Sequence, residues 1–158
     1  MTPKTLRYIA YSVILTIMIL SLYPLVSDYF YTPKFSEIAI MGPNENIGEY
    51  VHQVPIGTEY SVRFYIGNHE TETKLYKTVV KLVDNSTLLE SSPPFEVEAL
   101  TSYLTVVRDG ENSTFSINPM INQEFNGKLV AELYVFDPSS DSYVYHDRWV
   151  AIWLRTEN

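Results

Sequence analysis

The sequence predicts a mainly β protein, with one N-terminal transmembrane helix followed by an immunoglobulin-like antiparallel β-sandwich of about seven strands. Two observations lead to this expectation. Residues 8–26 contain no charged side chain, whereas the remainder alternates apolar and polar residues with period two, broken by Gly, Pro and Asn. We therefore expect a cytoplasmic tip at 1–7, a transmembrane helix at 8–26, a neck at 27–34 and an extracellular domain at 35–158.

The apolar stretch at 8–26 is long enough for a bilayer crossing, because about 20 helical residues span a hydrocarbon core of about 30 Å. Its hydroxyl side chains are expected to bond back to helix carbonyls. Ser12 and Thr16 are four residues apart and are expected to form one face that contacts neighbouring membrane helices. Pro24 is expected to kink or end the helix. Two other interpretations stay open, a buried core helix and a cleaved signal peptide.

Charge is distributed unevenly along the chain. Lys4 and Arg7 are the charged residues of 1–27, whereas 28–158 contains nine basic and nineteen acidic residues, a net charge of −10. Basic residues beside an apolar helix stay in the cytoplasm, so the N-terminus is expected there and the C-terminal domain outside the cell. The acidic surface argues against nucleic-acid binding, and the absence of cysteine excludes a disulfide framework.

Two N-x-[ST] sequons begin at Asn85 and Asn112. Each lies in a polar stretch between apolar runs, where a glycan has room. We expect both asparagines to be glycosylation sites on an extracellular glycoprotein.

The strands of the sandwich are predicted from alternation and from β-branched and aromatic content. Turn residues separate them, notably at 67–70, 84–86, 91–94, 126–127 and 137–140. No convincing amphipathic helical repeat occurs after residue 34. The expected strands lie at 35–41, 58–66, 75–83, 95–99, 114–117, 129–136 and 143–154.

Four segments carry a family resemblance: FSEIAIMGPNENIGEY at 35–50, VPIGTEYSVRFYIGNHE at 54–70, YKTVVKL at 76–82 and YHDRWVAIWL at 145–154. Through them the outer part resembles the largely archaeal membrane-protein family called domain of unknown function 1616. That family has no established activity, and its domain usually follows several membrane helices, where this chain has one apolar segment. The architecture is also similar to archaellum-associated surface proteins with one N-terminal helix and an outer β-sandwich.

The candidate metal ligands include three histidines, His52, His69 and His146. The neighbours His69-Glu70 and His146-Asp147 are unsuitable, because adjacent strand residues point to opposite faces. His69 is instead expected to cap a tight turn, and His146 to be a half-exposed strand residue. The sequence also lacks a nucleophile elbow, a phosphate-binding glycine loop and a calcium loop. We expect no catalysis, no metal and no cofactor.

Two tryptophans on the last strand, Trp149 and Trp153, share a face with Tyr143 and Tyr145. We expect both tryptophans to fill the sandwich core. The alternative is an aromatic strip that binds a sugar or a protein.

The expected function is that of a single-pass, membrane-anchored surface protein whose non-catalytic β-sandwich is a binding or structural module. It would serve as an accessory subunit of a membrane or cell-surface assembly. Its partners would be the lipid bilayer and other membrane or cell-surface proteins. Three alternatives are a tether between membrane and surface layer, a surface metal-dependent enzyme, and a secreted domain. The candidate interaction residues are His69, Glu70, Trp149 and Trp153.

Overall fold

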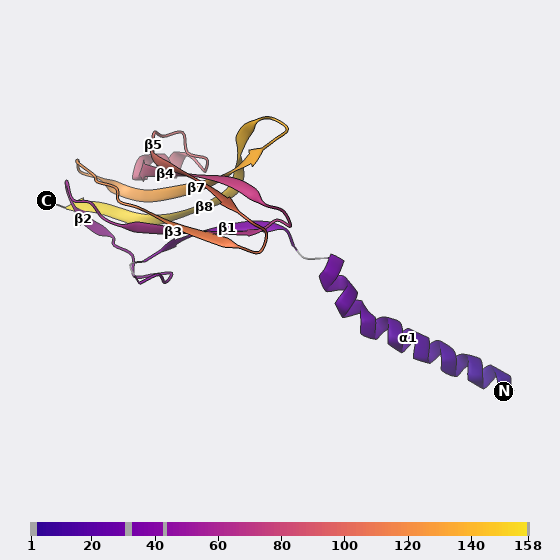
Figure 1. Ribbon diagram of the computed structural model, residues 1–158. Helices are drawn as coiled ribbons and strands as arrows, with labels where there is room; N and C mark the ends of the chain where they lie inside the picture. The colour runs from indigo at the N-terminus through magenta and orange to yellow at the C-terminus, as the bar shows by residue number, and fades with distance from the viewer. Residues whose placement is uncertain (1–2, 31–32, 43, 158) are drawn as a thin grey trace. The chain divides into compact units, whose positions relative to one another are not determined.

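The structure, a computed structural model, describes residues 3–30, 33–42 and 44–157. The chain divides into two units, Met1–Pro33 and Lys34–Asn158 (Figure 1). Each unit is described by itself.

The first unit consists of helix α1, Pro3–Phe30. The predicted back-bonding of hydroxyl groups is confirmed, since the Ser12, Thr16 and Ser21 hydroxyls donate to carbonyls three or four residues earlier at 2.9 Å. The helix continues past Pro24, so the proline does not end it, and the first residues of the predicted neck are helical.

A helix that crosses a bilayer needs about 20 apolar residues in succession. In the described part of the chain, no helix meets this combined requirement of length and hydropathy. The transmembrane helix predicted over 8–26 is therefore confirmed as a helix and is not confirmed as a membrane span.

The second unit is a two-layer β-sandwich (Figure 1). The small sheet has the strand order β1-β3-β6 and the large sheet the order β2-β8-β7-β4-β5. All pairs are antiparallel except β2 with β8, which is parallel. The strands are β1 Phe35–Met41, β2 Gln53–Pro55, β3 Val62–His69, β4 Lys74–Asp84, β5 Ala99–Val107, β6 Asn112–Ile117, β7 Asn126–Asp137 and β8 Ser142–Glu157.

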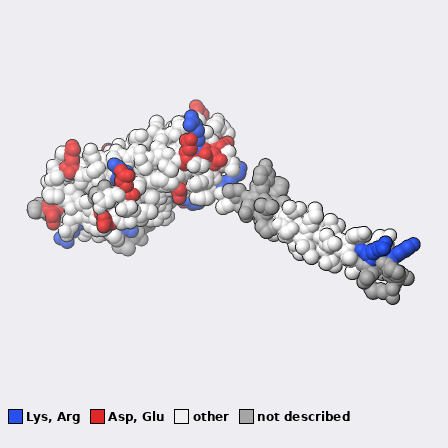
Figure 2. Space-filling model, turned by 60° about the horizontal axis from the view of Figure 1, so that its bottom comes forward, with Lys and Arg blue, Asp and Glu red and all other residues white. Residues whose placement is uncertain are grey.

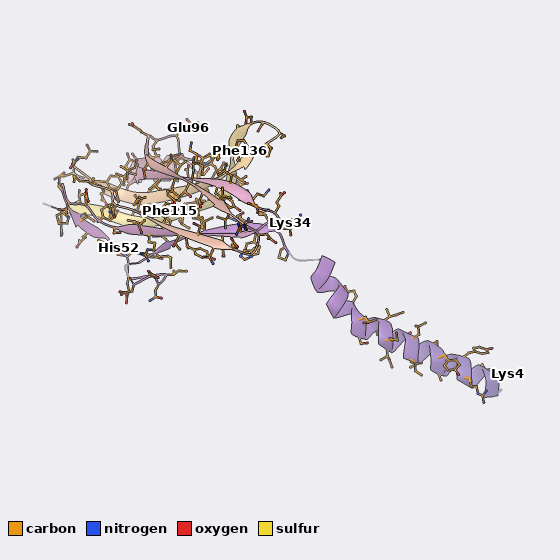
Figure 3. The ribbon with its side chains drawn as sticks, in the orientation of Figure 1. Lys4, Lys34, His52, Glu96, Phe115 and Phe136 are labelled. Atoms are coloured by element: carbon orange, nitrogen blue, oxygen red, sulfur yellow. The ribbon has the colours of Figure 1, made fainter. Side chains whose placement is uncertain are left out.

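The main core lies between the two sheets and follows the predicted alternation. In β3, Phe64 and Ile66 are fully buried, whereas Arg63 is half-buried. The Phe64 ring stacks on Phe115 of β6 at 5.3 Å between centroids, and Tyr103 of β5 stacks on the same Phe115 at 4.0 Å. The stack joins the two layers, and Figure 3 places Phe115 between them.

The segment 91–98 differs from the prediction of a strand at 95–99. Phe95 is buried, but the ladder begins only at Ala99, where β5 starts. Helix α2, Asn85–Glu90, also lies where only a turn was predicted. Its N-cap is Asp84, whose carboxylate accepts from the Thr87 N–H at 2.8 Å. A six-residue helix is too short to show hydrophobic periodicity, and the capping residue Asp84 is its sequence signal.

Two predicted breaks are in fact parts of strands. Gly67 lies within β3 and pairs with Glu37 of β1. The Glu37 side chain crosses over Gly67, so an added Cβ would overlap it. Gly127 pairs with Asp84 at the start of β7, where an added Cβ would meet the backbone oxygen of Val83. Here glycine permits a close approach of strands and does not mark a turn.

Candidate functional site

A cluster of polar side chains lies between the sheets where β1 begins. Ser36 Oγ is the centre, 2.7 Å from the Tyr76 hydroxyl, 2.9 Å from Glu70 Oε1 and 3.0 Å from His146 Nε2. Glu70 Oε1 lies 3.1 Å from the same His146 nitrogen. Burial, the larger cause, and the Glu70 charge raise the pKa of Tyr76, although its bond to Ser36 opposes them. We call these four residues the end cluster.

The end cluster contains a serine, a histidine and an acid, which invites comparison with a hydrolase. In a catalytic triad the serine and the acid contact different nitrogens of the imidazole. Here both contacts use Nε2 of His146, and Ser36 is only 1% exposed. The geometry is therefore that of a structural hydrogen-bond network joining β1, β4 and β8.

The side chains of His69 and Glu70 were expected to point to opposite faces, and in the structure they have different partners. His69 ends β3, stacks on Phe35 at 4.6 Å and lies 3.3 Å from Glu37 Oε1. Because it is paired with Phe35 in the ladder, His69 does not cap a turn. The side-chain bond at this turn comes from its neighbour, since Asn68 Oδ1 accepts from the Glu70 N–H at 3.0 Å.

His146 occupies an irregular point of β8 and is half-buried, as predicted. The register with β7 shifts between Leu133 and Tyr134, so that His146 and Asp147 are extra residues in β8. Asp147 has a φ of 51°, in the left-handed region. This bulge places His146 in the end cluster. Among the residues that the structure describes, no three His, Asp or Glu side chains converge in a way that would hold a metal ion.

A second buried polar group lies on the outer face of the large sheet, and sequence reasoning missed it. Lys81 of β4 and Glu132 of β7 form an ion pair with Nζ and Oε2 2.7 Å apart. The other Glu132 oxygen accepts from the Phe95 N–H at 2.6 Å, and Lys81 donates to the Phe95 carbonyl at 2.5 Å. Tyr134 donates to Glu132 at 2.9 Å. We call these contacts the outer clamp, because they hold 91–98 against the sheet.

The outer clamp explains why 95–99 does not form a strand. The backbone groups of Phe95 bond to two charged side chains and need no neighbouring strand. The Phe95 ring packs on Val83 and Val130 in a small second core. Glu96 marks this covering segment in Figure 3.

The two tryptophans lie on the outer face of the large sheet, so the expectation that they fill the core is wrong. Trp149 is 42% and Trp153 53% exposed. The inward positions of β8 are occupied by Ile152 and Leu154, which are buried. Tyr143, Tyr145, Trp149 and Trp153 do share one face, because each pairs with an even-numbered residue of β7.

The tryptophan rings are held by neighbours. Lys128 Nζ lies 4.6 Å from the centre of the Trp153 ring, a cation–π contact. Phe95 approaches Trp149 edge-on with centroids 6.3 Å apart. We call Trp149, Trp153 and Lys128 the tryptophan face.

Both sequon asparagines are accessible in the described structure. Asn85 is exposed at the first position of α2, and Asn112 is exposed at the first position of β6. Ser12 and Thr16 lie one above the other on α1, since Thr16 Oγ1 donates to the Ser12 carbonyl.

The sequence profile of a known family, "Domain of unknown function (DUF1616)", matches residues 32–150, three quarters of the chain. The chain belongs to this family. The match includes the four residues of the end cluster and Trp149, and it ends within β8, before Trp153. No curated protein matches the sequence significantly.

Several solved β-domains are similar at low sequence identity. The CARDB domain of a Pyrococcus furiosus protein, solved with di-metal ions, has a TM-score of 0.47 at 8% identity, covering 80% of this chain and 91% of that one. The PmoD soluble domain from Methylocystis sp. has a TM-score of 0.35 at 10% identity, covering 80% and 94%. A Listeria innocua beta-glucosidase in complex with isofagomine has a TM-score of 0.43 at 10% identity over 78% of this chain, which spans 16% of the enzyme.

Proposed function

We propose that this chain is a non-catalytic binding module held at the outer surface of a membrane, where it serves as an accessory subunit of a protein assembly. The observation that carries the proposal is the exposed tryptophan face of the large sheet. Tryptophan is among the residues most enriched at the energetic centres of protein interfaces. Here Trp149 and Trp153 lie in water at 42% and 53% exposure.

The tryptophan face is suited to binding because its rings are already oriented. Lys128 contacts the face of Trp153, and Phe95 contacts Trp149. A partner that covers these rings therefore immobilises few additional rotamers, which lowers the entropic cost of association. The cation of Lys128 favours a partner with an acidic or carbonyl-rich rim.

The location at a membrane is supported by helix α1 and by charge. Tyr8, Ile14 and Leu20 are 72%, 61% and 65% exposed, so the helix presents apolar surface that a lipid environment would cover. Figure 2 shows basic side chains at the N-terminal end of the described helix and acidic side chains over the β unit. Lys4 and Arg7 favour the cytoplasmic side for this end, and the accessible sequons suit an outer location for the β unit.

Crosslinking in intact native cells tests the binding role. We expect the chain to form a discrete crosslinked product with one partner, and Trp149→Ala/Trp153→Ala to lose most of it. Ile47→Ala is the control, because Ile47 is an apolar side chain 79% exposed in a loop. Equal crosslinking by all three proteins would contradict the proposal. Recovery of the product in the cell-wall fraction would favour a tether to the surface layer over a membrane subunit.

Membrane location has its own test. We expect the full chain to sediment with membranes and to resist extraction at alkaline pH, and added protease to digest the β unit in wall-less intact cells. Release by carbonate would contradict attachment through α1. Protection of the β unit until lysis would contradict the outer location.

A further inference from the structure

One edge of the large sheet is an uncharged strand. Strand β5, ALTSYLTVV, contains no charged residue, proline or glycine. It pairs with β4 on one side, and in the described chain no strand pairs with its other side. Leu104 and Val106 are 55% and 64% exposed. Such an edge readily pairs with another strand.

The other three sheet edges differ from β5 in ways that discourage pairing. Strand β2 has only three residues, one of them Pro55. Strand β1 carries the charged Glu37 as its third residue. Strand β6 has six residues, and Asn112, Ser113 and Thr114 make its first half polar. Short length, proline and charge are the usual means of protecting an edge, and β5 has none of them.

We propose that β5 pairs antiparallel with β5 of a second copy of this chain, about a twofold axis at Tyr103, so that two large sheets become one. In this register Thr101 lies opposite Thr105 and Ser102 opposite Leu104. Leu100 lies opposite Val106, which brings two exposed apolar side chains close together. A bulge against β4 lies beside Leu100, and Thr101–Thr105 on its C-terminal side form a regular centre for the pairing.

Charge complementarity selects the second copy as the occupant. The twofold axis at Tyr103 places Glu98, just before β5, opposite Arg108, just after it, in the other copy. The pair occurs twice, once at each end of the interface. Both side chains are exposed, and within one copy Arg108 lies 3.6 Å from Glu111. An axis shifted by one residue to Leu104 would place Arg108 opposite Leu100 and lose both charge pairs.

A cysteine scan of the full chain in detergent tests the register directly, because the chain has no cysteine of its own. Residues directly opposite in an antiparallel pair have Cα atoms about 4.5–5.5 Å apart, within disulfide range. We expect Tyr103→Cys to form a disulfide-linked dimer under mild oxidation. Thr101→Cys is the matched control on the same face, since its two copies would lie about 13 Å apart along the strands.

Charge reversal provides an independent test that leaves the strand intact. We expect Glu98→Arg or Arg108→Glu alone to weaken dimerisation about tenfold, measured by sedimentation equilibrium at low salt. The double exchange Glu98→Arg/Arg108→Glu should restore it, because both contacts return with the signs exchanged. Glu124→Arg, an exposed reversal away from β5, should change little.

The results separate this proposal from its competitors. A disulfide at Tyr103→Cys together with rescue by the double exchange supports it. A disulfide formed by Leu104→Cys instead would overturn the register. A chain that remains monomeric in every variant would overturn the pairing, as would crosslinking of the edge to a different protein only.

Discussion

The end cluster, between the two sheets, and the outer clamp, on the outer face of the large sheet, are both buried polar groups, yet they differ in water access and charge. In the end cluster the His146 and Glu70 side chains are 25% and 15% exposed. In the outer clamp Lys81 and Glu132 are 8% and 0% exposed. Water can therefore partly replace a lost partner in the end cluster but not in the outer clamp. Removing one charge from a dry pair leaves the other uncompensated, which costs more than the pair contributes.

The largest effect is expected for Glu132→Ala. It leaves the Lys81 ammonium and the Phe95 N–H buried without their carboxylate partner. We expect a loss of about 3–5 kcal/mol in the free energy of unfolding, measured by urea denaturation.

The double variant Lys81→Met/Glu132→Leu is the control for that experiment. It removes both charges while keeping apolar volume, so it should be clearly more stable than Glu132→Ala. If the double variant is as unstable as the single one, the unpaired charge does not explain the effect, and the lost partners of the Phe95 backbone or lost packing do.

A smaller loss is expected for Ser36→Ala in the end cluster. The buried Tyr76 hydroxyl loses its 2.7 Å partner, while Glu70 and His146 keep their mutual contact. We expect a loss of about 1–3 kcal/mol by the same measurement. Ser140→Ala in the exposed β7–β8 turn is the control and should be close to neutral. If Ser36→Ala lowers the free energy of unfolding as much as Glu132→Ala does, the difference in water access does not determine the cost of losing a partner.

Trp149→Ala tests whether the tryptophan face supports the outer clamp. Trp149 covers one edge of Phe95, and this aromatic contact is worth about 0.5–1.5 kcal/mol. We expect a loss of about 1 kcal/mol and faster hydrogen exchange in 91–98. Trp153→Ala lacks the Phe95 contact and serves as the control. Equal effects of the two substitutions on exchange would contradict a supporting role for Trp149.

The smallest effect is expected from alkaline pH. Burial, followed by the bond to Glu132, raises the pKa of Tyr134 above its usual value of 10.0. The unfolded chain then releases this proton before the folded chain does. The stabilisation is full below about pH 10 and is lost as pH rises further. Tyr134→Phe should flatten the fall in unfolding free energy between pH 9 and pH 11, and an unchanged slope would contradict this assignment.

The sequence predicted the sandwich because alternation survives in strands with one buried face. Phe64 and Ile66 are buried as their parity requires, and the two-sheet architecture follows from such strands. The strand at 99–107 escaped prediction because Leu104 and Val106 are apolar yet exposed, so the edge strand has no clear two-sided pattern. The tryptophans were misplaced because parity says which residues share a face but not which face is inside.

The site was less predictable than the fold. The end cluster joins Ser36 to His146, which are 110 positions apart, through a bulge that leaves no local sequence signal. The outer clamp had one indirect sign, since Lys81 and Glu132 each interrupt an apolar strand. Interpreting them as partners required the register between β4 and β7. The proposed binding surface could not be predicted from the sequence, because the exposure of Trp153 depends on how the whole sheet packs.

The enclosure of Lys81 gives the protein a built-in reporter. An amine-acylating reagent will modify exposed lysines such as Lys34 directly, but it reaches Lys81 only when 91–98 lifts from the sheet. The rate of acylation at Lys81, measured by mass spectrometry, therefore reports how often the segment 91–98 opens.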